Sequence, residues 1–352
     1  MSTRRKFFVK TELTKTGTAD GAKSSEKCST LQIQENIRAA LEGLTEPKTA
    51  APETAALDAA KMPASNKIEI EENADMKNYT SFKAGGRAAA LIKVSSADAL
   101  KEVLKALAKK EIPHLFLGNG SNILFRDEGY AGAVIKMQDF ADVAVNEDRV
   151  VCQTGIYMSS LAKILMNEGL AGFEFASGIP GTLGGGLFMN AGAYGGELKD
   201  IVMSVRAISP DGEEERVFSR EEMQFGYRSS ILQQNGFIAV EAELKLEKGL
   251  PHEIGGKMRE LAAKRNTKQP VQYPSAGSTF KRPEGFFAGK LIEDAGLKGV
   301  SVGGAQVSTL HSGFIINKGG ATATDILLLI DLVRNTVYDK FGVMLEPEIR
   351  II

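Results

Sequence analysis

The pattern of apolar and polar residues predicts interspersed helices and strands from about Lys67 onward. Helices are predicted where apolar residues recur every three or four positions, and strands where short apolar runs are bounded by turn residues. The predicted helices span residues 95–111, 159–168, 257–268, 287–295 and 324–341. The predicted strands span residues 91–94, 114–117, 150–153, 201–208, 237–246, 314–317 and 343–352. An Asp-Gly turn at residues 211–212 predicts an antiparallel hairpin, so an α+β fold is favoured.

The first 65 residues have a different pattern and are rich in Ala, Thr, Lys and Glu. Leu31–Leu44 carries apolar residues at helical spacing, which predicts one short helix. Residues 45–65 have the composition of a solvated linker. We therefore expect residues 1–65 to be a polar, disordered tail that need not pack. One domain is expected over residues 66–250 and a second over residues 251–352.

Gly172–Gly196 is the most unusual stretch, because nine of its twenty-five residues are glycine. Glycine loses more backbone entropy on folding than other residues, so this density requires turns or a close approach of the backbone to another group. Pro180 restricts one φ angle, which indicates a shaped loop over residues 177–181. A glycine-rich linker is the alternative, but linkers lack embedded apolar residues such as Ile179 and Phe188. The stretch therefore predicts a ligand-contacting loop whose N–H groups bind an anion such as phosphate.

A second loop of small residues, Gly118–Asn122, directly follows the strand predicted over residues 114–117. Its N–H groups are also suited to a diphosphate. Its sequence, GNGSN, is not GxGxxG and no helix follows it, so a Rossmann fingerprint is disfavoured. By itself the motif is as compatible with a plain turn as with a binding loop.

Composition narrows the function classes. At 352 residues the chain is long enough for two or more domains with buried cores. The net charge of −1 and the lack of clustered basic and aromatic residues favour neither nucleic acid nor membrane as a partner. Cys28 and Cys152 are far apart and the three histidines are scattered, so no disulfide framework or histidine-ligated metal is expected. No apolar run approaches the ~20 residues that span a bilayer, and the basic start is no secretory signal, so we expect a cytoplasmic protein.

Three further segments are candidates for chemistry or charge recognition. Glu348 lies in the apolar strand predicted over residues 343–352, where a carboxyl group needs a partner or has a raised pKa. Residues 273–283 are bounded by prolines and dense in hydroxyl groups and cations. Arg228 lies between two predicted strands and alone suggests no more than a surface residue. The cations of residues 257–268 are interpreted as the solvated face of a helix.

Taken together and in order, four segments resemble the UDP-N-acetylenolpyruvoylglucosamine reductase (MurB) family, the flavoenzymes of peptidoglycan precursor synthesis. They are GNGSN (118–122), SGIPGTLGG…NAGAYGGE (177–197), GYRSS (226–230), and AGSTFKRP (276–283) with LEPE (345–348). The likeness covers about residues 78–352, and residues 286–299 are similar to the shorter, type II variant. The resemblance implies a PCMH-type FAD-binding domain of two α+β lobes, followed by a smaller C-terminal α+β substrate-binding domain.

The resemblance also implies an oxidoreductase, a UDP-N-acetylmuramate dehydrogenase that works in two half-reactions. NADPH, the co-substrate, reduces FAD. Flavin N5 then passes a hydride to C3 of the enolpyruvyl group of UDP-N-acetylglucosamine enolpyruvate, and C2 is protonated to give UDP-N-acetylmuramate. Two alternatives stay open: another PCMH-fold FAD oxidase or dehydrogenase of a small molecule, and a non-catalytic protein that binds flavin or nucleotide sugar.

Carried onto this sequence, the family's catalytic residues fall on Arg228, Ser278 and Glu348. Ser278 is the expected proton donor to C2, although an unassisted serine is a weak acid. Arg228 would bind the substrate carboxylate or enolate oxygen through its fixed guanidinium geometry. Glu348 must be protonated or act through water, since a carboxylate would repel an enolate. Glu346 would share its face of a regular strand, but Glu348 holds the matching place in LEPE.

The resemblance places FAD against the two glycine-containing loops, without a covalent bond, since GNGSN offers no histidine for attachment. The expected FAD-binding residues are Gly118, Asn119, Gly120, Ser121, Asn122, Ser177, Gly178, Ile179, Pro180, Gly181, Gly184 and Gly185. The expected substrate-binding residues are Asn190, Lys281, Arg282, Lys298 and His311. The cations among them would meet the diphosphate and carboxylate of the substrate. For Asn190 and His311 an ordinary polar role is an equal alternative.

Overall fold

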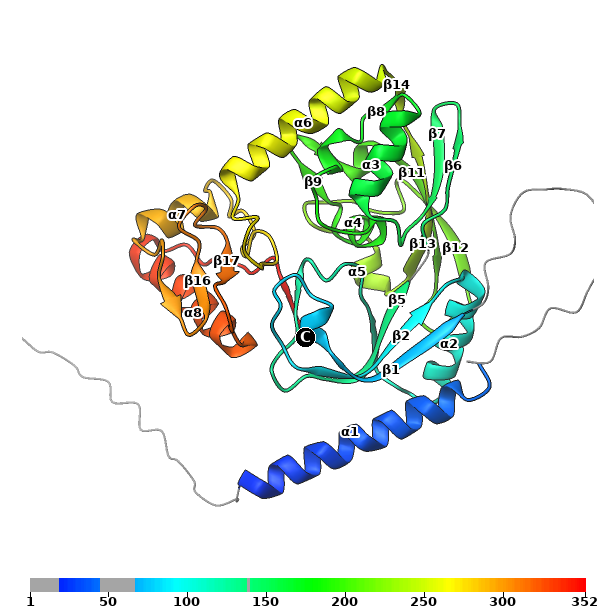
Figure 1. The fold of residues 1–352 in the computed structure, drawn as a ribbon, viewed down its shortest axis with the longest axis vertical. Coiled ribbons are helices and arrows are strands. Elements are labelled where there is room, and N and C mark those ends of the chain that lie inside the picture. Colours follow the sequence, from blue (N-terminus) through cyan, green and yellow to red (C-terminus); the bar gives the residue numbers. More distant parts are fainter. Residues whose placement is uncertain (1–18, 45–66, 138–139) are drawn as a thin grey trace, which may run out of the picture.

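The computed structural model describes residues 19–44, 67–137 and 140–352, and for residues 19–29 it describes the backbone alone. Figure 1 shows two lobes that contain most of the strands and a smaller group of helices and short strands near the C-terminus. The long helix α6 (Pro251–Lys268) runs from the second lobe to this C-terminal group. The mixture of antiparallel sheet, parallel pairs and helices agrees with the predicted α+β class.

The first lobe is built on a four-stranded sheet in the order β1-β2-β5-β3. Its strands are β1 (Ile68–Asp75), β2 (Arg87–Val94), β3 (His114–Phe116) and β5 (Tyr130–Met137), with the 3₁₀ turn η1 (Met76–Asn78) after β1. β2 pairs antiparallel with β1 and parallel with β5, and β5 pairs parallel with β3. Helix α2 (Ala97–Lys109) packs its apolar positions into the core of this lobe. The loop GNGSN leaves the sheet just beyond the carboxyl end of β3.

The second lobe is a five-stranded antiparallel sheet in the order β12-β11-β13-β7-β6. Its strands are β6 (Val143–Asn146), β7 (Arg149–Gln153), β11 (Val202–Ile208), β12 (Glu215–Ser219) and β13 (Ile238–Lys245). Its helices are α3 (Met158–Asn167), α4 (Leu183–Met189) and α5 (Leu232–Asn235), with η2 (Glu174–Ala176) and η3 (Leu198–Asp200). Two short ladders, β8 (Leu170–Ala171) with β14 (Glu247–Lys248) and β9 (Gly192–Ala193) with β10 (Gly196–Glu197), complete it. The glycine-rich stretch thus forms η2, α4, β9 and their connections.

The C-terminal group packs around one long helix, α8 (Ala323–Phe341), which buries one apolar face made of Ile326, Leu329, Ile330, Val333 and Val337. Its other elements are α7 (Ala288–Asp294), β15 (Ser301–Val302), β16 (Ala305–Val307) and β17 (Ile315–Asn317). After α8 the chain returns to the first lobe, where β18 (Arg350–Ile351) pairs parallel with β4 (Ile123–Leu124). The strand predicted over residues 343–352 is therefore wrong in extent, because only its last part pairs with a neighbouring strand.

Helix α1 (Ala19–Leu41) contains most of the helix predicted over Leu31–Leu44 and begins earlier. It packs against α2 and β2, where Ile37 and Leu41 are buried among apolar side chains of the first lobe. Arg38 also pairs with Glu72, with Nη2 2.7 Å from a carboxylate oxygen. The expectation that this segment need not pack is therefore wrong for its described helical part. Residues 1–18 and 45–65 of the predicted tail lie outside the described residues.

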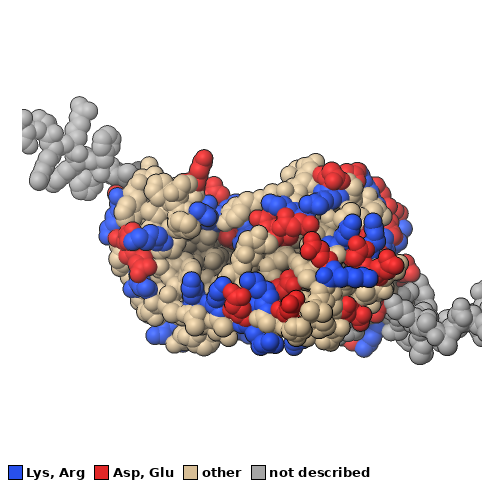
Figure 2. Space-filling model, turned by 90° about the horizontal axis from the view of Figure 1, so that it is seen from above, with Lys and Arg blue, Asp and Glu red and all other residues tan. Residues whose placement is uncertain are grey.

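The surface charges, the hydropathy of the helices and the buried cysteine do not indicate a nucleic-acid or membrane partner among the described residues. Figure 2 shows cations and carboxylates interspersed over the face in view, in keeping with the net charge of −1. Among the described residues, no helix is both long and apolar enough to cross a bilayer. Cys152 is buried as a free thiol, and burial raises its pKa to about 12. This thiol is therefore a packing residue rather than a nucleophile.

Truncating the buried face of α1 should destabilise the first lobe. Leu41→Ala removes a fully buried side chain and should lower the free energy of unfolding by about 2–5 kcal/mol. Leu31→Ala is the matched control, since Leu31 is 60% exposed and should cost less than about 0.5 kcal/mol. Urea unfolding followed by far-UV circular dichroism measures both. Equal, negligible effects would mean that α1 does not contribute to the folded core.

Candidate active site

A cavity of about 930 Å³ lies where the two lobes and the C-terminal group meet. Its volume is near the upper end of the range for cofactor and ligand pockets, about 300–1,000 Å³. The first lobe contributes residues 115–123 to its wall, and the second contributes much of the glycine-rich stretch. The C-terminal group contributes residues 276–278 and the segment that carries Glu348. Two loops and three predicted catalytic residues that are distant in sequence thus share one cavity.

The loop Gly118–Asn122 presents a row of backbone donors. Among the described residues, no protein acceptor is hydrogen-bonded to its N–H groups. Its carbonyls are held instead: Lys136 donates to that of Gly118 (2.8 Å) and the Ser81 N–H to that of Gly120 (3.0 Å). Gly120 has a φ of +63°, and a Cβ there would lie 2.1 Å from the Tyr79 carbonyl oxygen, so only glycine fits. A held loop with unpaired N–H groups is suited to an anion.

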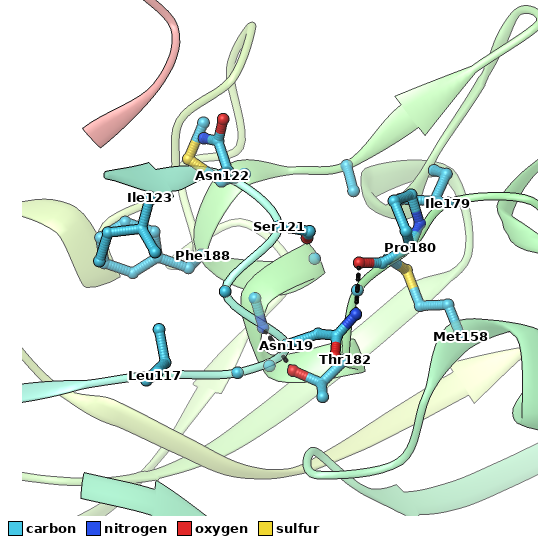
Figure 3. A pocket seen from close by; sticks show the side chains of 18 of the residues that line it. Leu117, Asn119, Ser121, Asn122, Ile123, Met158, Ile179, Pro180, Thr182 and Phe188 are labelled. Atoms are coloured by element: carbon cyan, nitrogen blue, oxygen red, sulfur yellow. Dashed lines mark hydrogen bonds between the residues drawn. The ribbon is translucent and has the colours of Figure 1, made fainter. Parts of the chain in front are cut away.

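The loop that contains Pro180 closes against this row. Figure 3 shows Asn119 directed at Pro180, whose carbonyl accepts a hydrogen bond from Asn119 Nδ2 at 3.1 Å. Thr182 caps α4, since its Oγ1 accepts from the N–H of Gly185 at 3.4 Å. A Cβ on Gly118 would lie 2.5 Å from that same Oγ1. The glycines therefore allow two loops to touch, and the linker alternative is excluded.

Most of the residues predicted to bind FAD line the cavity. Those that do are Gly118, Asn119, Gly120, Ser121, Asn122, Ile179, Pro180, Gly181, Gly184 and Gly185. Ser177 and Gly178 are not among the lining residues. The Ser177 hydroxyl donates to the Glu174 carbonyl at 2.8 Å, and Gly178 packs against Arg265, so that a Cβ there would lie 3.3 Å from Arg265 Cδ.

The donors and walls of the cavity fit the FAD that the resemblance implies. The unpaired N–H groups of Gly118–Asn122 suit a diphosphate. Met158, Ile164, Ile179 and Phe188 supply apolar wall suited to a flat ring system. Within the described ranges, no cluster of three or more His, Cys, Asp or Glu side chains is placed to hold a metal ion.

Arg228 and Glu348 meet at the cavity although 120 residues separate them. Arg228 Nε donates to Glu348 Oε1 at 2.7 Å, and Nη2 to the Gly192 carbonyl at 3.4 Å. Arg228 has a φ of +53°, in the left-handed region that a residue with a long side chain seldom adopts. Hydrogen bonds between Gly226 and Ser229 close the turn around it. Backbone strain of this kind persists where the surroundings hold a side chain in a required direction.

Asn190 supports this turn and does not line the cavity. It is buried at the C-cap of α4, and its Nδ2 donates to the Gly226 carbonyl and to Glu197 Oε2, both at 2.9 Å. Its Oδ1 accepts from the N–H of Lys199 at 3.0 Å. Since both ends of the amide are taken by protein groups, the structure favours a supporting role over the predicted substrate contact.

The segment that carries Glu348 is joined by a short ladder to the residues that follow Ser278. The Glu348 N–H donates to the Thr279 carbonyl at 2.8 Å, and the Lys281 N–H to the Glu346 carbonyl at 2.9 Å. These bonds bring the backbone of Glu348 to the residue after Ser278, and both Ser278 and Glu348 line the cavity. Burial raises the pKa of Glu348, although the nearby cations Arg228 and Lys281 oppose this. Glu348 thus keeps its proton to higher pH than an ordinary glutamate.

Glu346 is turned away from the cavity. Its side chain is 72% exposed and pairs with Lys281 Nζ at 3.1 Å, whereas the side chain of Glu348 is 13% exposed. The segment is irregular here, with only an isolated bridge between Phe280 and Pro347. The expectation that both carboxylates share one face of a regular strand is therefore wrong, and Glu348 is the carboxyl group of the cavity.

The remaining predicted substrate residues lie outside the cavity lining: Lys281, Arg282, Lys298 and His311. The Arg282 guanidinium lies 4.0 Å from the ring centroid of Phe287. Lys298 pairs with Glu293 at 3.0 Å. His311 accepts a backbone hydrogen bond at Nδ1, and burial lowers its pKa. In this structure each of these side chains is engaged within the C-terminal group or at its surface.

Four residues of the cavity wall with a charged or amide side chain were not predicted from the sequence: Lys136, Arg265, Gln269 and Arg350. Arg350 could have been found, because it lies close in sequence to Glu348, a predicted site residue. Arg265 belongs to the basic helix interpreted as a solvated face. That interpretation is wrong at this position, where the helix end is half-buried against the loop of Gly178.

Comparisons with known proteins assign the two parts of the chain. Residues 88–217 match the family model for an FAD binding domain, and residues 269–352 match that for the C-terminal domain of UDP-N-acetylenolpyruvoylglucosamine reductase. The reductase of that name from Clostridioides difficile (strain 630) is 52% identical over 290 residues, which cover 82% of this chain and 94% of the relative. That from Alkaliphilus oremlandii (strain OhILAs) is 53% identical over 278 residues, which cover 79% and 91%.

A solved structure agrees with these relatives. The crystal structure of UDP-N-acetylenolpyruvylglucosamine reductase (MurB) from Thermus caldophilus superposes with a TM-score of 0.69 and 35% identity, covering 81% of this chain and 98% of that one. The predicted fold class, with an FAD-binding part and a C-terminal part, is confirmed by this likeness and by the matched families. The chain therefore belongs to the UDP-N-acetylenolpyruvoylglucosamine reductase family and is an FAD-dependent enzyme of that family.

Proposed function

We propose that this chain reduces UDP-N-acetylglucosamine enolpyruvate to UDP-N-acetylmuramate, with NADPH as the source of reducing equivalents. The observation that carries the proposal is the convergence of Arg228, Ser278 and Glu348 on one cavity wall. The substrate is supported by the names of the two similar reductases from Clostridioides difficile and Alkaliphilus oremlandii. FAD, when bound, supplies the hydride to the substrate carbon. The residues of the chain bind the substrate anion, orient it and deliver the proton.

Arg228 is the group that binds the substrate carboxylate or the developing enolate oxygen. Its Nε is occupied by Glu348 and its Nη2 bonds only weakly to Gly192, at 3.4 Å. The guanidinium therefore keeps N–H donors for a ligand while the pair with Glu348 fixes its plane. A cation at this position stabilises negative charge as it develops, which is the largest single effect in many enzyme active sites.

Ser278 is the proton donor in this proposal. Its side chain is exposed toward the cavity, and the part of the chain that the structure describes offers its hydroxyl no hydrogen-bond partner. Gly277, just before it, has a φ of +75°, which turns the chain at this point. A serine hydroxyl is a weak acid, so it transfers a proton only when the receiving carbon carries negative charge and the serine is resupplied. Glu348, with its raised pKa, is the neighbouring acid that resupplies it.

The proposal is tested with purified protein loaded with FAD. Anaerobic NADPH should bleach the flavin absorbance, and UDP-N-acetylglucosamine enolpyruvate should restore it as UDP-N-acetylmuramate forms. A flavin that is bleached but recovers only with oxygen would contradict the proposed substrate. A flavin that NADPH does not reduce would contradict the proposed hydride source.

Ser278→Ala should separate the two half-reactions. Reduction of the flavin by NADPH should stay within about twofold of wild type, whereas reoxidation by the enolpyruvate should fall by at least about 10²–10⁴-fold, the range for a lost general acid. Stopped-flow absorbance measures each step. Ser301→Ala removes an exposed hydroxyl of the same C-terminal group and should change neither rate. Equal slowing of both half-reactions by Ser278→Ala would exclude Ser278 as the proton donor.

Glu348→Gln should remove a pH dependence. Because burial raises the pKa of Glu348, the wild-type rate of reoxidation should decline as pH rises through that pKa and the acid loses its proton. Glutamine cannot titrate, so the variant should be at least about 10²-fold slower and its residual rate should lack this decline. Glu346→Gln should keep the wild-type pH profile, since Glu346 is exposed. An unchanged decline in Glu348→Gln would assign it to another group.

A further inference from the structure

Arg265 is a cavity cation without a protein counter-ion. It lies in the last turn of α6 and lines the cavity, and no acceptor among the described residues hydrogen-bonds or ion-pairs with its guanidinium. The other cations of the wall are engaged: Lys136 with the Gly118 carbonyl, Arg228 with Glu348, and Arg350 over the ring of Phe188. Burial lowers the pKa of Arg265, so its charge is costly to hold there without a partner.

The place of Arg265 indicates which part of a ligand it meets. Its Cδ and Nη1 lie against the backbone of Gly178, in the loop that leads to Pro180. Tyr194, just after β9, lies close to Arg265, and Arg228 bonds to Gly192 within β9. Arg265 therefore shares a stretch of cavity wall with the catalytic residue Arg228. The diphosphate of FAD has hydrogen-bond donors in the N–H groups of Gly118–Asn122, and the substrate carboxylate has the guanidinium of Arg228.

Gln269, one turn further along, gives a second indication. It also lines the cavity, and its Oε1 is buried without a hydrogen-bond partner among the described residues. Buried polar atoms in folded proteins are nearly always paired, so an orphan requires an explanation. Two polar side chains without protein partners, at one end of one helix, indicate that a bound polar group completes this corner of the cavity.

We propose that Arg265 meets the oxygen-bearing edge of the FAD ring system and raises the reduction potential of the bound flavin. When the ring accepts a hydride it gains one negative charge, and a nearby cation stabilises that charged form relative to the oxidised one. The contact deepens the proposed function and rests on it, because it places the ring beside Arg265, on the part of the cavity wall that Arg265 shares with Arg228. Arg265 is thus a cofactor-tuning residue on the helix that connects the second lobe to the C-terminal group.

Arg265→Gln tests this inference through the potential and not through turnover. The potential of the bound flavin is measured by equilibration with a reference dye, in excess FAD so that weakened binding does not hide the result. The equilibrium constant for flavin reduction should fall at least about tenfold, which for a two-electron couple is about 30 mV. Arg265→Lys, which keeps the charge, should give a smaller fall. Lys268→Gln, a neutralised exposed cation of the same helix, should give none.

Three outcomes would overturn the inference. An unchanged potential with weaker FAD binding would place Arg265 at the diphosphate. An unchanged potential and FAD affinity with a raised KM for UDP-N-acetylglucosamine enolpyruvate would place it at the substrate. An equal lowering of the flavin potential in Arg265→Gln and Lys268→Gln would show that the effect comes from the overall charge of the surface and not from a contact of Arg265. The proposed function fails separately, if the wild-type flavin is not reoxidised by the enolpyruvate, and the dye measurement stays valid in that case.

Discussion

The cavity depends on backbone hydrogen bonds made by residues 346–352. On one side these residues bond to Thr279 and Lys281 in the C-terminal group. On the other side they bond to Asn122 and Leu124 in the first lobe, next to the loop suited to a diphosphate. One short segment therefore sets the distance between the anion-binding loop, Ser278 and Glu348. Contacts between side chains alone would not achieve this, because each contact would have to offset the conformational entropy lost when its own side chain is ordered. The shared backbone segment positions the loop, Ser278 and Glu348 together.

The second lobe holds Arg228 in position through buried polar groups. Arg228 needs a strained turn to reach Glu348, and Asn190 holds the carbonyl of Gly226 beneath that turn. A buried amide that lost one of these partners would leave a group unsatisfied, which costs about 1–3 kcal/mol. The strain at Arg228 is therefore maintained by a network that is itself expensive to disturb. The glycines of the neighbouring stretch, residues 172–196, also help to position the site, because they let backbone segments approach each other closely.

Much of the fold and of the site could be predicted from the sequence, because the relevant signals are local. The loop GNGSN, the loop around Pro180 and the residues Ser278 and Glu348 stand in short motifs. Other features depend on how helices and strands that are distant in the sequence pack against each other. The helical spacing of Leu31–Leu44 predicted a helix, but its apolar stripe does not say that α2 and β2 receive it. The sequence around Arg265 is as basic and polar as that around a solvated cation. Only the packing of α6 places Arg265 at the cavity. For Asn190 the resemblance implied a substrate contact, with an ordinary polar role as an equal alternative. The sequence could not separate the two, because polar groups that support a site and those that touch a substrate have the same chemistry.

The distance in sequence between the parts of the cavity also sets an order of assembly during synthesis. The contact of Asn119 with Pro180 joins two loops of the FAD-binding part, so it can form before the C-terminal group has left the ribosome. The bond from Asn122 to the Glu348 carbonyl spans 226 residues and must wait for nearly all of the chain. Contacts of such long range form slowly, since loop closure precedes any gain from them. A nascent chain can thus join its two loops well before Glu348 is made, whereas the cavity is completed only when residues 346–352 have been added.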